Sequence, residues 1–196
     1  MRKLSITVFI SIFILAQSTS FAQKHFTNLD KVAHAIESKL QLTMPGWERT
    51  SIKPASIDEN TNSDQVIIQQ WSSKKRNVKI AVLAHQTEAE AIIALRQFAV
   101  DKRTNSKLEG LGDEAYLWGI NNSIAFRQGN LTLYMSAVAV VDLDSSEASR
   151  NLAEARRKAA KAEHDEEAKL TKNFAHNVAA VLASLWSSCD GDAISL

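Results

Sequence analysis

Five histidines and one cysteine are the side chains of this sequence best suited to metal binding or nucleophilic chemistry. His164 is followed directly by three carboxylates, Asp165 to Glu167, a grouping that could hold a divalent cation weakly. Successive helical residues point about 100° apart, however, so only His164 and Glu167 would share a face. His85 and Glu88 stand at a predicted strand-to-helix turn, where they fit a helix cap as well as a metal. A solvated run of charges is therefore favoured, and the sequence predicts no metal site.

Nucleophilic catalysis has no recognisable local motif. The patterns G-x-S-x-G, H-E-x-x-H and G-x-x-x-x-G-K-[ST] are absent from the 196 residues. Cys189 has no histidine beside it and lies in a polar C-terminal tail, which favours an idle thiol over pairing with another chain. We expect no catalytic residue and a non-enzymatic protein. A hydrolase whose residues come together from distant loops is the alternative.

The segment Gly110 to Ala115 matches G-x-G-x-x-A, the pattern of a dinucleotide-binding turn. Such a site needs a strand before the glycines and a helix after them, so that the helix N-terminus meets the pyrophosphate. Here the strand-forming residues Ala115 to Trp118 follow instead. The glycines are expected to give a tight entry into a strand, and no cofactor is predicted.

Basic and aromatic residues give no nucleic-acid signature. Lys74 to Arg76 and Arg156 to Lys161 are the two basic clusters, and neither is interleaved with the aromatic residues that single-strand binding uses. The four tryptophans, Trp47, Trp71, Trp118 and Trp186, are dispersed, which is more typical of core residues than of a pocket. A pocket walled by them, serving a carrier of a small apolar ligand or lipid, stays open as an alternative function.

The first 22 residues read as a secretory signal peptide. Arg2 and Lys3 precede a 13-residue apolar run, Leu4 to Ala16, and small residues at Ser20 and Ala22 mark a cleavage site after Ala22. Thirteen helical residues rise about 20 Å, too little to span the bilayer. We expect an exported protein, periplasmic or secreted, with no membrane insertion after cleavage.

The mature part, residues 23–196, has the composition of one globular domain. The formal charge of the whole chain is +1, and loss of Arg2 and Lys3 leaves 21 basic against 22 acidic residues. A charge this close to zero gives no general attraction to nucleic acid or anionic membranes. A lone cysteine provides no internal disulfide, and 174 residues are enough to build a core without one.

Periodicity and turn residues predict an α+β fold. Strands joined by short hairpins imply a curved antiparallel β-sheet flanked by helices. Thr87 to Glu90 fits a capping box at the start of the second helix. The predicted helices are 27–40, 87–102 and a long C-terminal one, and the predicted strands are 47–57 (short), 65–71, 78–85, 115–118, 124–127 and 131–141.

The long charged C-terminal helix is the unusual feature. Residues 130 to 190 contain neither Gly nor Pro. One helix over residues 145–187 would measure about 65 Å, against a diameter of roughly 40 Å for the domain, so it must protrude or break. The extension 145–168 bears a stripe of small residues, Ala148 to Ala162, spaced 4-3-4-3. Such spacing permits close helix approach, so the extension is expected either to contact another protein or a second copy, or to stand as an exposed helix.

The segment Leu108 to Tyr134 contains a GLGDEAY sequence followed by IAFRQGN. This pairing resembles small exported bacterial proteins of the PsbP/Mog1-like type, several of whose families have no known function. The resemblance implies a curved antiparallel sheet flanked by helices, and it transfers no catalytic residue. With no catalytic motif found, we expect an exported non-enzymatic domain acting by protein–protein interaction.

Overall fold

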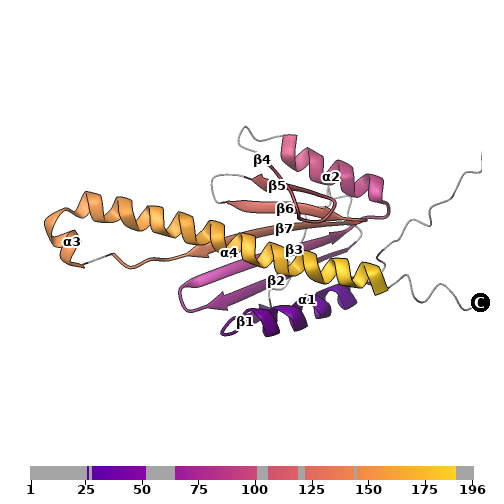
Figure 1. Ribbon diagram of the computed structural model, residues 1–196, viewed down its shortest axis with the longest axis horizontal. Coiled ribbons are helices and arrows are strands. Elements are labelled where there is room, and N and C mark those ends of the chain that lie inside the picture. Colours follow the sequence, from indigo (N-terminus) through magenta and orange to yellow (C-terminus); the bar gives the residue numbers. More distant parts are fainter. Residues whose placement is uncertain are drawn as a thin grey trace, which may run out of the picture.

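The computed structural model describes residues 26, 28–51, 65–100, 106–118, 122–143 and 145–188. The expected signal peptide, residues 1–22, and Cys189 lie outside the described residues. Within them, a single open sheet is covered by helices, and the α+β prediction is confirmed (Figure 1).

The sheet has seven strands in the order β1-β2-β3-β7-β6-β5-β4, and every neighbouring pair is antiparallel. Two hairpins, β2–β3 and β6–β7, meet at the central β3–β7 pair. The strands are β1 (Glu48–Ser51), β2 (Gln65–Ser73), β3 (Arg76–Ala84), β4 (Ser106–Leu108), β5 (Glu114–Trp118), β6 (Ser123–Gln128) and β7 (Leu131–Ala139).

Helices lie on both faces of the sheet. The helices are α1 (Leu29–Thr43), α2 (Glu88–Val100), α3 (Ser145–Arg150) and α4 (Leu152–Ser188). Helices α1 and α4 cover the face we call inner, where alternate strand residues such as Ile80, Phe126 and Leu133 are buried against Ile36 and Phe174. Helix α2 contacts β6 and β7 and lies on the opposite, outer face.

Local sequence signals account for the starts of two helices. The Asn28 side chain accepts a hydrogen bond from the Lys31 N–H at 3.0 Å and caps α1. At α2 the predicted N-cap is confirmed, since the Glu90 N–H donates to Thr87 Oγ1 at 3.2 Å. The Glu90 carboxylate turns back as in a capping box, but it accepts from the N–H of Gln86, one residue before the N-cap.

Helix α4 is continuous over 37 residues, about 55 Å. Its second half buries a stripe on the core, made of Leu170, Phe174, Val178, Val181 and Leu182. Its first half runs on past the end of the sheet to α3, as Figure 1 shows at the left. A break at Asn151 separates α3 from α4, so the helical stretch of residues 145–187 both breaks and protrudes.

Candidate functional site

The protruding part of the chain forms what we call the arm, residues 140–162, of which residue 144 lies outside the described range. Its base is fixed by backbone groups that extend β7. The Val140 N–H donates to the Lys75 carbonyl at 3.0 Å. The Val141 N–H donates to Glu163 Oε1 at 3.0 Å and the Ala139 N–H to Glu167 Oε1 at 3.3 Å. Two carboxylates one turn apart thus join α4 to an edge of β7 that lies beyond the end of β6.

The stripe of small residues is partly buried within the arm itself. Ala155 is buried, Ala159 is half-buried and Ala162 is exposed, while the side chain of Ala148 lies outside the described residues. Helices α3 and α4 contact each other. Ala155 is the one buried residue among those described in the arm, so the arm adds almost nothing to the core.

Exposed aliphatic side chains are concentrated on the arm. Among the described residues, six large hydrophobic side chains are exposed, and Val140 at 55%, Leu143 at 42% and Leu152 at 45% belong to the arm. Val138, at 56%, lies directly at its base. The other two, Leu42 and Ile93, are on α1 and α2.

In the described part of the arm, the acidic side chains are held in ion pairs, whereas the basic side chains are exposed. Five cationic side chains are exposed: Arg150, Arg156, Arg157, Lys158 and Lys161. The described carboxylates of the arm, Asp142 and Glu154, each form an ion pair, with Lys75 and Arg157 respectively. Glu166 pairs with Arg76 at 3.2 Å. Glu163 and Glu167 are also engaged at the base, so the exposed side chains described in the arm are predominantly basic.

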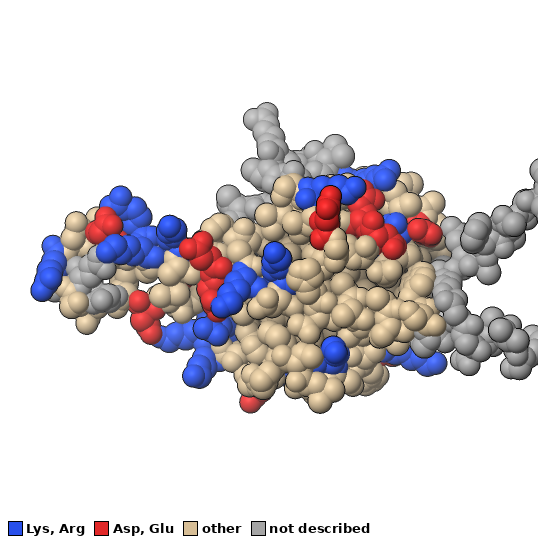
Figure 2. All heavy atoms as spheres, viewed as in Figure 1, with Lys and Arg blue, Asp and Glu red and all other residues tan. Residues whose placement is uncertain are grey.

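The two basic clusters, 80 residues apart in sequence, lie at the same end of the molecule. The tip of the β2–β3 hairpin carries Lys74 to Arg76, and its contacts to Asp142 and Glu166 hold it against the base of the arm. Figure 2 shows Lys and Arg side chains gathered on the arm and beside its base.

The GLGDEAY and IAFRQGN segments meet at the other end of β6. Arg127, whose side chain is 8% exposed, donates to Glu88 at 2.7 Å and to the Gly129 carbonyl at 2.9 Å, and lies 3.0 Å from Asp113. Asp113 also accepts from the Gly129 N–H at 2.7 Å. Strand β5 follows the glycines, so a phosphate-binding helix N-terminus is not formed there.

A second polar cluster lies next to that network. Tyr116 donates to Glu114 Oε1 at 2.6 Å, and Arg96 donates to the same carboxylate. The Tyr116 hydrogen bond, with help from Arg96, lowers the pKa of Glu114 against the opposing effect of burial. The same hydrogen bond and burial raise the pKa of Tyr116. These groups tie α2 to β5.

The two histidines singled out in the sequence, His85 and His164, do not assemble with the carboxylates that follow them. His85 hydrogen-bonds Thr132 at 2.8 Å while Glu88 binds Arg127, so this pair serves separate contacts. Asn122 contacts the ring of His164. Among the described residues no group of three or more His, Cys, Asp or Glu is placed to hold a metal ion.

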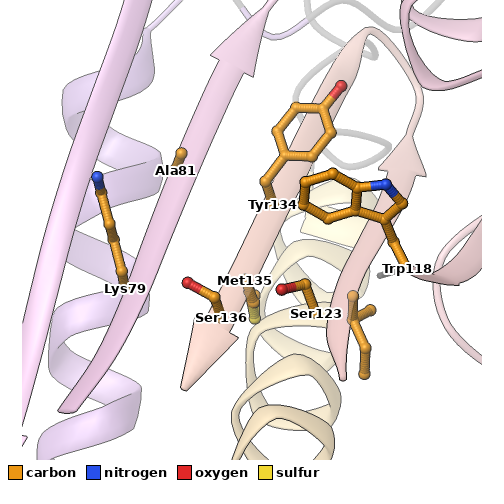
Figure 3. A pocket seen from close by; sticks show the side chains of 8 residues that line it. Lys79, Ala81, Trp118, Ser123, Tyr134, Met135 and Ser136 are labelled. Atoms are coloured by element: carbon orange, nitrogen blue, oxygen red, sulfur yellow. The ribbon is translucent and has the colours of Figure 1, made fainter. Parts of the chain in front are cut away.

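A cavity of about 210 Å³ lies on the outer face. Figure 3 shows its lining from β3, β5, β6 and β7: Lys79, Ala81, Trp118, Ser123, Ile124, Tyr134, Met135 and Ser136. Of the four tryptophans, Trp118 alone lines it. Trp71 is fully buried, Trp47 packs edge-on against Phe174, and Trp186 packs against Phe26. The sequence pointed to Trp118 but not to the cavity's polar residues, because these come from three separate strands, β3, β6 and β7.

No helix in the described part of the chain is both long and apolar enough to span a membrane. Comparison with known proteins found no matching family model, no matching curated protein and no matching solved structure.

Proposed function

We propose that this protein is an exported, non-enzymatic binding domain that acts by protein–protein interaction, with the arm as its contact surface. The observation that carries the proposal is the concentration of exposed aliphatic side chains, Val140, Leu143 and Leu152, on a segment that projects from the domain. Exposed apolar side chains grouped on a projection, rimmed by charge, are typical of interaction sites.

The arm's construction supports the same proposal. It is ordered by helix propensity, by the Glu154–Arg157 pair and by the carboxylate contacts at its base, while only Ala155 is buried within it. From Leu152 to Glu163, α4 extends about 16 Å beyond its attachment to Val141. A projection that the core does not need is well placed to contact a partner.

The exposed charged side chains described in the arm favour an acidic partner. Its five exposed cations would attract carboxylates around an apolar contact. A second copy, which the sequence left open, fits less well, because two such arms would bring like charges together. An anionic bilayer also fits less well, since residues 140–162 contain no Phe, Trp or Tyr to anchor at the interface.

The alternative functions draw less support from the described residues. A cavity of about 210 Å³ is smaller than the ~300 Å³ at which ordinary ligand pockets begin, and Lys79 and two serines line it, which is a poor fit to a lipid. The lining includes no histidine or carboxylate to act as a general base for a hydrolase.

An armless variant tests the proposal. Because Val141 and Glu163 are hydrogen-bonded, residues 142–162 can be replaced by a short Gly/Ser linker without moving the base. We expect the full chain to form a formaldehyde cross-linked adduct in its own cells, and the variant to fold and to lose that adduct. A folded variant that retains the adduct would refute the arm as the contact surface, and a variant that unfolds would show that the arm is structural.

A further inference from the structure

A row of four residues crosses the outer face of the sheet in register. Lys79 on β3 is paired with Ser136 on β7, and Ser123 on β6 with Trp118 on β5. The pairing of Ile124 with Met135 brings Ser123 beside Ser136 and closes the row. Ala81 and Tyr134, paired with each other, stand in the next row. Four separate strands thus supply one site.

The sizes of these side chains explain why the sheet is hollowed here. Ala81, Ser123 and Ser136 are small and form the floor, whereas Lys79, Tyr134 and Trp118 are long and stand around it (Figure 3). Large side chains surrounding small ones leave a cavity of about 210 Å³. Its position on the outer face separates it from the α1 and α4 side of the sheet, where the core packs.

The polar groups of the cavity are donors. Beyond the backbone pairing of the sheet, no hydrogen bond or ion pair joins the side chains of Lys79, Ser123 and Ser136 to any other residue that the structure describes. Burial raises the pKa of Tyr134, so its hydroxyl keeps its proton at neutral pH. The lining contains no carboxylate. An ammonium and two serine hydroxyls beside one space complement a negative charge, while the Tyr134 hydroxyl is hydrogen-bonded to Thr132.

We infer that this cavity binds a small aromatic anion, a single ring bearing a carboxylate. Benzene fills a cavity of about 150 Å³ in another protein, so about 210 Å³ accommodates one ring and a carboxylate. The carboxylate would lie by Lys79 and Ser136, with the ring beside the indole of Trp118. This function is independent of the arm, which lies beyond the end of the sheet.

Titration with benzoate tests the inference, with benzyl alcohol as the uncharged counterpart. Binding is followed on the full mature chain by NMR, using the backbone amides of Ser123 and Ser136 as reporters. We expect saturable shifts of both amides with benzoate. Lys79→Gln should weaken benzoate binding about tenfold, because it removes a charged donor. Lys39→Gln, at an exposed lysine on α1, is the matched control and should leave binding unchanged.

Ala81→Leu gives a second, independent variant. It fills the floor while retaining Lys79, and it should abolish the shifts in a protein that remains folded. Three results would overturn the inference: no saturable shift of the two amides in the wild-type chain, benzoate binding by Lys79→Gln within about twofold of wild type, or benzyl alcohol binding as tightly as benzoate.

Discussion

The Glu163 carboxylate accepts a hydrogen bond from the backbone N–H of Val141 at 3.0 Å, across 22 residues of sequence. One turn further along, Glu167 does the same for Ala139. These two contacts satisfy N–H donors at the end of β7 and just after it, on the side where β6 no longer runs alongside, and they set the point at which the arm leaves the sheet. They also engage two carboxylates that would otherwise add negative charge to the exposed surface of the arm.

Removing the first of these contacts should loosen the base of the arm. Glu163→Ala leaves the Val141 N–H without its charged acceptor, which costs about 1 kcal/mol locally. Hydrogen exchange at Val141 should then accelerate about fivefold to tenfold. Asp165→Ala, at an exposed carboxylate two residues away, is the control and should leave that exchange rate unchanged.

Two neighbouring glycines should differ sharply in their tolerance of a side chain. A Cβ at Gly112 would lie 2.2 Å from the Arg127 carbonyl oxygen, whereas a Cβ at Gly110 meets nothing within 4 Å. Both have positive φ, so both substitutions cost about 1 kcal/mol of strain. Gly112→Ala should lose about 3 kcal/mol of unfolding free energy in urea. Equal losses at both positions would contradict the packing described.

Arg127 should be the most sensitive charged residue of the fold. Arg127→Met removes a nearly buried cation from Glu88, Asp113 and the Gly129 carbonyl, at an expected cost of about 3 kcal/mol. Arg157→Met breaks an exposed pair on α4 and should cost under about 0.5 kcal/mol. Chemical denaturation of both variants measures the difference, and similar costs would refute the role assigned to Arg127.

The Glu114–Tyr116 pair should make stability depend on acid pH. Because the pKa of Glu114 is lowered in the folded protein, its contribution is present above the unfolded value of 4.5 and is lost as pH falls through the folded value. Tyr116→Phe removes the main cause of that shift. The stability difference between wild type and Tyr116→Phe should therefore shrink on going from pH 6 to pH 3. A difference independent of pH would show that the hydrogen bond does not favour the charged form.

Local patterns predicted most of the strands but not the site. The alternation of Val78, Ile80 and Val82 identifies β3 and its inner face, and the structure confirms it. Strand β4 was missed because Ser106–Leu108 is a three-residue edge strand without any pattern. The sequence also did not reveal that Glu163 and Glu167 are engaged at the base of the arm, because their partners lie 22 and 28 residues away. The cavity depends on cross-strand register, which sequence periodicity does not supply.

Site-specific photocross-linking tests the central claim, that the arm is the contact surface, most directly. A photoreactive residue replaces Leu152 on the arm or, as the control, Leu42 on α1, which is more exposed at 82%. In the protein's own cells, we predict an adduct with a different, acidic protein from position 152 and none from position 42. The charge reversals Arg156→Glu and Lys161→Glu together should reduce that adduct at least about tenfold. Absence of an adduct at position 152, or equal adducts at positions 152 and 42, would contradict the account.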